Sequence, residues 1–136
     1  MEEQRLAGQI PASHLDLFCK RALGHLATLM PDGRPHVTPV WIDYDGTCLL
    51  VNTARGRRKE LNVRQRPWVA LDITDPDNPS RRLIIQGKVI EATTDNAEEH
   101  LVRLSQRYLG LETYPSRVPD EVRVILKIQP EQVLFK

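Results

Sequence analysis

Alternating apolar and polar positions predict a chain built mainly from β-strands. The clearest alternation runs from Glu121 to Ile128, where at least every second residue is apolar. The predicted strands cover residues 25–30, 35–44, 47–53, 68–74, 82–91 and 121–128. Asp45-Gly46 is typical of a two-residue hairpin turn and joins the second strand to the third. Pro130 predicts the end of the last strand, because proline donates no ladder hydrogen bond, and leaves residues 132–135 as an extended tail.

Three segments show the helical period of 3.6 residues instead. Residues 10–21 predict a first helix, and residues 59–65 predict a short one. The face expected to be buried on the first helix carries Leu15, Phe18, Cys19 and Ala22. The strongest pattern covers residues 95–109, where Asp95 and Glu98 resemble a capping box ahead of an apolar stripe.

The remaining segments predict connections. Residues 1–9 predict a loose lead-in, residues 75–80 a polar loop, and residues 110–120 an irregular connection with two prolines. Antiparallel strands joined by hairpins, with helices between them, predict a mainly β fold with flanking helices, as in a small barrel or sandwich. We expect one domain over residues 1–136, since this length buries a sizeable core and shows no internal repeat.

Charge and cysteine content exclude several classes of function. Lysine plus arginine is 19 and aspartate plus glutamate is 18, so a net charge of +1 gives no overall attraction to nucleic acid or anionic membranes. Cys19 and Cys48 form no Cys-x-x-Cys motif. The N-terminus lacks the pattern of a signal peptide, and no apolar stretch is long enough to span a bilayer. We therefore expect a cytoplasmic protein with reduced thiols.

A local basic cluster stands out against this neutral background. Arg55, Arg57, Arg58 and Lys59 surround Gly56, between a predicted buried strand and the short helix over residues 59–65. Unpaired backbone N–H groups at a helix start and forked arginine donors suit a phosphate. The alternative interpretation is a solvated basic loop. Pro39, in the middle of a predicted strand, indicates an edge, a bulge or a position that faces a ligand.

Other kinds of site find little support. The histidines have no metal-ligand spacing, and neither cysteine lies in an electropositive setting that would make it a nucleophile. The glycine patterns of Walker and dinucleotide-binding loops are missing. Tyr44 and His36 are conceivable proton donors, but a tyrosine and a histidine on strands are more often structural. We therefore assign no catalytic residue and no metal site.

The segment from Gly33 to Ile73 resembles the split-barrel flavoproteins of the pyridoxamine 5′-phosphate oxidase type. Within that superfamily it is most similar to the small deazaflavin-dependent reductases that use coenzyme F420. The first matching motif, Gly-x-Pro-x-x-x-Pro-Val-Trp, contains Gly33, Pro35, Pro39, Val40 and Trp41. The second motif, Thr-x-x-Gly-Arg-x-Lys, contains Thr53, Gly56, Arg57 and Lys59. A continuation through Asn62, Pro67 and Ala70-Leu71, and a later strand over residues 83–87, also fit.

The resemblance implies a six-stranded antiparallel split β-barrel of Greek-key type, known as the FMN-binding split barrel. It also implies a homodimer with cofactor sites at the interface. The residues expected to bind the cofactor are Val37, Thr38, Pro39, Val40, Trp41, Asn52, Thr53, Arg55, Gly56, Arg57, Arg58, Lys59 and Gln86. The basic residues would meet the phosphate, residues 37–41 the ring system, and Gln86 would approach from a neighbouring strand or from the partner chain.

The activity implied by the resemblance is hydride transfer from reduced coenzyme F420 to an electron-poor small molecule. Two alternatives remain: an FMN-dependent oxidoreductase of the same fold, and a non-enzymatic protein that binds the cofactor. The substrate-binding residues of true pyridoxamine 5′-phosphate oxidases are not recognisable, and the short chain favours the deazaflavin branch.

Overall fold

A computed structural model describes residues 2–136 and confirms the mainly β fold. The strands are β1 (Gln4–Ala7), β2 (Gly24–Leu29), β3 (Pro35–Val40), β4 (Asp43–Tyr44), β5 (Leu49–Ala54), β6 (Trp68–Asp75), β7 (Asn78–Thr93) and β8 (Arg123–Phe135). The helices are η1 (Ala12–Cys19), α1 (Arg58–Gln65) and α2 (Ala97–Leu109). All six predicted strands are present, the one over residues 35–44 as β3 and β4, and the short strand β1 is additional.

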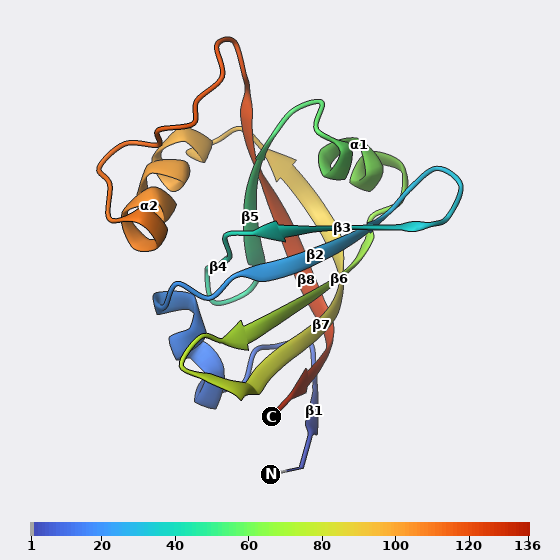
Figure 1. Ribbon diagram of the computed structural model, residues 1–136. Helices are drawn as coiled ribbons and strands as arrows, with labels where there is room; N and C mark the ends of the chain where they lie inside the picture. The colour runs from blue at the N-terminus through green and yellow to red at the C-terminus, as the bar shows by residue number, and fades with distance from the viewer. Residues whose placement is uncertain (1) are drawn as a thin grey trace.

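All strands join one antiparallel sheet in the order β3-β2-β6-β7-β8-β5-β4, and β1 pairs with β8. The sheet curls into a half-barrel, with α1 and α2 at one end and both termini at the other (Figure 1). Alternate residues of the long strands point inward, and their apolar side chains form the main core, including Leu26, Leu71, Ile85 and Leu126. None of the helices within residues 2–136 has the length and apolar character that crossing a bilayer requires.

The predicted strand over residues 35–44 is wrong in one respect, because it divides between the two edges of the sheet. β3 pairs with β2 at one edge, and β4 pairs with β5 at the other. The chain crosses between them at Trp41 and Ile42, where the Ile42 N–H donates to the Tyr108 hydroxyl (3.0 Å). Pro39 lies on the edge strand β3, which is one of its predicted positions. The Asp45-Gly46 hairpin is confirmed, with the Asp45 N–H bonded to the Cys48 carbonyl.

Pro130 does not end a strand, contrary to the prediction. β8 continues through it to Phe135, and the register against β7 shifts where Gly87 lies opposite Pro130. A bulge of this kind accommodates the missing proline donor. β7 extends beyond the predicted residues 82–91 at both ends, so the expected loop at residues 75–80 is a tight turn between β6 and β7.

Near the N-terminus, the predicted loose lead-in over residues 1–9 is wrong for residues 4–7, which form β1 and pair with the end of β8, and Met1 lies outside the described residues. The first helix is shorter than predicted and is a 3-10 helix. Its tighter turn buries His14, Leu17 and Phe18, whereas the predicted core residues Leu15 and Cys19 are exposed. The capping box is also wrong, because α2 begins after a left-handed Asn96 with no side-chain cap.

Candidate functional site: a cavity with a cationic and an aromatic wall

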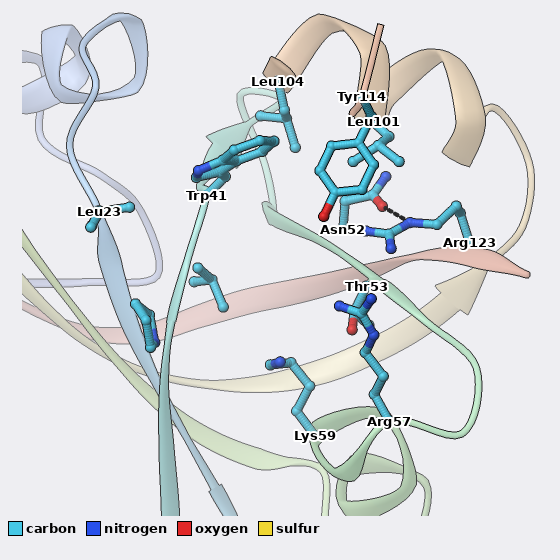
Figure 2. Close-up of a pocket in the computed structure, with 12 residues that line it drawn as sticks. Leu23, Trp41, Asn52, Thr53, Arg57, Lys59, Leu101, Leu104, Tyr114 and Arg123 are labelled. Carbon is cyan, nitrogen blue, oxygen red and sulfur yellow. Dashed lines mark hydrogen bonds between the residues drawn. The ribbon is translucent and has the colours of Figure 1, made fainter. Parts of the chain in front are cut away.

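A cavity of about 270 Å³ opens where α1, α2 and the start of β8 meet the ends of β3 and β5. Figure 2 shows its lining side chains in two groups, one basic and one apolar. The lining residues are Leu23, Pro39, Val40, Trp41, Asn52, Thr53, Arg57, Lys59, Leu101, Leu104, Tyr114 and Arg123.

Three cations form the basic wall. Arg57 immediately precedes α1, Lys59 is in its first turn, and Arg123 is the first residue of β8. Glu121 is the carboxylate that pairs with this group, at 3.2 Å from Arg123 and 3.5 Å from Arg57. Within residues 2–136, no carboxylate lies within ion-pairing distance of Lys59. The wall therefore carries an excess of positive charge.

Burial disfavours the charged forms of Lys59 and Arg123. Burial lowers the pKa of Lys59 below its ordinary value, and the nearby charges of Arg57 and Arg123 lower it further. Burial also lowers the pKa of Arg123, which is only 4% exposed, and the attraction of Glu121 opposes that effect. Arg57 is more exposed, but a cluster of like charges with buried members is stabilised by a bound anion, so the wall is suited to binding one.

Two polar side chains of β5 complete the basic wall. The Thr53 hydroxyl is buried and has no hydrogen-bond partner within residues 2–136. Such an orphaned buried group is uncommon and indicates a place where a ligand or ordered water supplies the missing partner. Asn52 is different, since its amide oxygen accepts from Arg123 Nε at 2.9 Å.

The opposite wall is aromatic and aliphatic. The ring of Trp41 stacks on that of Tyr108, with centroids 5.2 Å apart and planes within 5°. Tyr114 meets Trp41 edge-on and lies beneath the guanidinium of Arg123, 5.6 Å from its ring centroid. Leu101 and Leu104 of α2 fill the space between them and the sheet (Figure 2). This wall suits a flat apolar group.

A glycine and a buried carboxylate shape the turn that presents the cations. Gly56 has φ +87°, a left-handed conformation that other residues adopt at a cost. Its N–H donates to the carboxylate of Glu60, which Arg64 also binds one helical turn later. Burial raises the pKa of Glu60, but the stronger effect of the Arg64 hydrogen bonds lowers it. The Glu60 carboxylate therefore binds Gly56 and Arg64 and does not neutralise the cations that line the cavity.

The structure brings together only part of the predicted site. The predicted residues that line the cavity are Pro39, Val40, Trp41, Asn52, Thr53, Arg57 and Lys59. Arg55 lies in a separate hollow with Glu60 and Arg64, and Arg58 is exposed at the start of α1. Neither Arg58 nor the turn residue Gly56 lines the cavity.

The other predicted residues lie on β3 and β7. Val37 is exposed on β3, and Gln86 lies on β7 in a different hollow, beside Trp68. The Thr38 hydroxyl is buried without a partner within residues 2–136, but it does not line the cavity. His36 and Tyr44 do not line it either.

Sequence reasoning missed Arg123, Glu121 and Tyr114. The pairing of β5 with β8 places Arg123 opposite Ala54, two residues along the strand from Asn52 and on the same side of the sheet. The available signal was Arg123 itself, inside the apolar run of residues 122–128. Arginine is seldom fully buried unless it is paired, so a charged residue in a predicted buried strand indicates a partner or a ligand. No such signal marks Tyr114, which lies on an irregular loop.

Comparisons with known proteins show which family has this fold. The family model for pyridoxamine 5′-phosphate oxidase matches residues 10–136. A solved structure named F420 reductase is 32% identical, with 91% of this chain and 98% of that chain covered and a TM-score of 0.78. A putative pyridoxamine 5′-phosphate oxidase from Listeria innocua is 25% identical over 83% of this chain and 86% of that chain, with a TM-score of 0.60.

A conserved hypothetical protein from Mycobacterium tuberculosis shares the fold, with a TM-score of 0.73, 23% identity and coverage of 98% of this chain and 89% of that chain. A search of curated proteins finds no match. The family model covers nearly the whole chain. The chain therefore belongs to the pyridoxamine 5′-phosphate oxidase family, a family of oxidoreductases whose split-barrel fold binds flavin-type cofactors.

Proposed function

We propose that this protein is a coenzyme F420-dependent oxidoreductase that reduces an electron-poor small molecule. The observation that carries the proposal is the cavity, which is lined by Arg57, Lys59 and Arg123 and by Thr53, whose buried hydroxyl has no partner within residues 2–136. The 32% identity to the protein named F420 reductase favours the deazaflavin over FMN.

The residues present fit a phosphate-bearing cofactor with a flat ring. The three cations would bind the phosphate through charge-assisted hydrogen bonds, and the Thr53 hydroxyl would gain the partner it lacks. Pro39, Val40 and Trp41 would line the ring, where Pro39 offers no backbone donor. When bound, the deazaflavin would supply the hydride, and this protein's own groups would bind and orient it and exclude water.

Within residues 2–136, the lining of the cavity contains no cysteine, serine, aspartate or glutamate. This composition agrees with a reaction in which the cofactor carries the chemistry. It also agrees with a protein that only binds the cofactor, so the test includes turnover.

Side-by-side titration with coenzyme F420 and FMN tests the proposal. We expect micromolar or tighter binding of F420, followed by its fluorescence, and a loss of at least about tenfold in the Arg57→Ala, Lys59→Ala double variant. Arg58→Ala is the matched control, because Arg58 belongs to the same basic run but is exposed outside the cavity. Unchanged F420 fluorescence would refute the proposal, and tighter binding of FMN would favour the FMN-dependent alternative.

Turnover decides between an enzyme and a binding protein. Reduced F420 would be mixed with the protein and a panel of quinones, nitroaromatics and α,β-unsaturated carbonyls. We expect oxidation of F420 with at least one acceptor, and slower oxidation in the double variant than in Arg58→Ala. Binding without oxidation by any acceptor would leave the protein as a carrier of the cofactor.

We also propose that the protein is a homodimer through the outer face of the sheet. An uncharged row crosses five strands there, through the paired residues Val37, Ala27, Ala70, Gln86 and Gln132. Val37 is 58% exposed and the neighbouring Trp68 is 53% exposed. A second copy covering this row would remove both from water, and Gln86 would then lie at the interface.

Sedimentation of the 15.6 kDa chain tests the dimer. We expect twice this mass for the wild type and the monomer mass for Trp68→Glu. Leu111→Glu is the control, because Leu111 is a similarly exposed apolar residue on a different part of the surface. A wild type that sediments as a monomer would refute the dimer.

A further inference from the structure

A chain of hydrogen bonds runs behind the cavity and ends at one of its cations. Asp43 Oδ2 lies 3.0 Å from His100 Nε2, and His100 Nδ1 lies 3.1 Å from Asn52 Nδ2. Asn52 Oδ1 then accepts from Arg123 Nε at 2.9 Å, the bond drawn in Figure 2. The four residues come from β4, α2, β5 and β8, so the chain of bonds links four elements.

The orientation of the Asn52 amide follows from its neighbours. Its Nδ2 donates to the backbone carbonyl of Ala97 at 2.8 Å, and a carbonyl can only accept. Its Oδ1 accepts from Arg123 Nε, which can only donate. A flipped amide would place donor against donor and acceptor against acceptor. Asn52 therefore has one satisfactory orientation.

This orientation determines the tautomer of His100. The second hydrogen on Asn52 Nδ2 points at His100 Nδ1, which must accept and so carries no proton. The proton of the neutral ring is then on Nε2, where it donates to Asp43. Burial raises the pKa of Asp43, but hydrogen bonds from His100, the Tyr44 N–H and Arg107 outweigh it and hold this pKa at about 2. Asp43 is therefore ionised at neutral pH and can only accept the hydrogen bond from His100 Nε2.

These bonds leave Nη2 of Arg123 available to bind a ligand. Asn52 binds its Nε and Glu121 binds its Nη1, while no acceptor within residues 2–136 is hydrogen-bonded to Nη2. The guanidinium lies in the cavity wall, where Asn52 holds it at Nε and Glu121 holds it at Nη1. His100 is completely buried and makes no contact with the cavity, so it can act on a ligand only through Asn52.

We propose that Asp43 and His100 are positioning residues that, through Asn52, hold Arg123 in the orientation that binds the anionic group of the ligand. The inference rests on the proposed function for the identity of that ligand, a phosphate-bearing cofactor. Arg107 supports the far end of the chain, because it binds both Asp43 and the carbonyl of Ile42.

The first experiment needs no ligand and no variant. Long-range ¹H–¹⁵N spectra of the wild type report which ring nitrogen of His100 carries the proton. We expect Nε2–H, with Nδ1 unprotonated, and a slowly exchanging Nε–H signal from Arg123. An Nδ1–H tautomer, or an Arg123 Nε–H that exchanges as fast as that of an exposed arginine, would overturn the proposal even if no cofactor binds.

The second experiment uses variants and paired ligands. His100→Leu removes both hydrogen bonds of the ring, whereas His100→Gln keeps an amide that can accept from Asn52 and donate to Asp43. His14→Leu is the matched control, since His14 is also a buried, hydrogen-bonded histidine but lies at the other end of the barrel. The probes are F420 and FMN, each compared with its phosphate-free counterpart, 8-hydroxy-5-deazaflavin with its ribityl chain and riboflavin.

We expect His100→Leu to weaken binding of the phosphate-bearing probe by about tenfold or more, as for the loss of one charge-assisted hydrogen bond. Binding of the phosphate-free probe should stay unchanged, and His100→Gln should recover most of the loss. Equal weakening of both probes would show a merely structural role and overturn the proposal, as would full affinity in His100→Leu. If wild type binds neither cofactor, the proposed function fails, and the spectra of Arg123 Nε–H in His100→Leu and His100→Gln still test the positioning role.

Discussion

The carboxylate of Glu121 lies 3.2 Å from the guanidinium of Arg123, two residues later in the chain. Both side chains are more than nine-tenths buried, and Glu121 also reaches Arg57 at 3.5 Å. Glu121 is therefore the internal counter-ion of the cavity, and a bound anion would compete with it for the same cations.

Replacing this counter-ion should strengthen anion binding. We expect Glu121→Gln to bind the phosphate-bearing cofactor about tenfold more tightly, because one competing charge is removed. The free protein should lose roughly 1–3 kcal/mol of stability, since the buried Arg123 then lacks its charged partner. Calorimetric titration and urea unfolding measure the two effects. Glu112→Gln, on the exposed loop, is the control, and weaker cofactor binding in Glu121→Gln would contradict the idea.

Lys59 should make cofactor binding depend on pH. Burial, together with Arg57 and Arg123, lowers its pKa below the ordinary value of 10.5. Between the lowered pKa and 10.5 the folded protein binds fewer protons than the unfolded chain, so the stability of the free protein rises with pH in that window. A phosphate favours the charged lysine, and its affinity should fall as pH rises through the same window.

Lys59→Arg tests this explanation, because arginine stays charged throughout the window. Dissociation constants measured from neutral pH upward should become weaker with rising pH in the wild type and show no such trend in Lys59→Arg. The same trend in both proteins would show that another group is responsible.

Gly87 should be intolerant of any side chain. A Cβ built at this position would lie 2.5 Å from the backbone oxygen of Gln129, closer than real contacts allow. We expect Gly87→Ala to lose roughly 1–3 kcal/mol of unfolding free energy in urea, because β8 must move. Gln129→Ala, which changes only an exposed side chain on the facing strand, should stay within about 0.5 kcal/mol of the wild type.

The Tyr108 hydroxyl should stabilise the crossing between β3 and β4. It donates to the Ala22 carbonyl at 2.6 Å and accepts from the Ile42 N–H at 3.0 Å. Tyr108→Phe keeps the stacking on Trp41 but leaves these two buried groups without their partner, so we expect a loss of roughly 1–3 kcal/mol in urea unfolding. Tyr44→Phe, which removes an exposed hydrogen bond to Gly46, should cost less; equal losses would argue against this role.

Local pattern was enough to predict most elements of the sheet. The strand at residues 68–74 and the helix at 95–109 lie within two residues of their observed bounds, because each has a sustained period of one kind. The errors fall where distant contacts override local preference. Pro130 stays within β8 because Gly87 opposes it at a bulge, and residues 4–7 form β1 because β8 offers them an edge.

The same division applies to the site. The contiguous basic run and the proline strand predicted Arg57, Lys59 and the residues from Pro39 to Trp41, since neighbours in sequence share one turn or one strand. The sequence could not rank Arg58 against Arg57, because the direction of a side chain at a turn depends on Gly56 and on how α1 begins.

The sequence by itself thus determined the mainly β architecture, the family motifs and one cationic segment. Only the tertiary structure decided that Arg123 and Glu121 join that segment, because their approach depends on the register between β5 and β8, about seventy residues apart in the chain. A strand pattern predicts which residues face inward but not which strand lies alongside, and the hydrogen-bonded register sets that. For this reason the buried bonds from Asp43 to Arg123 could be seen only in the folded protein.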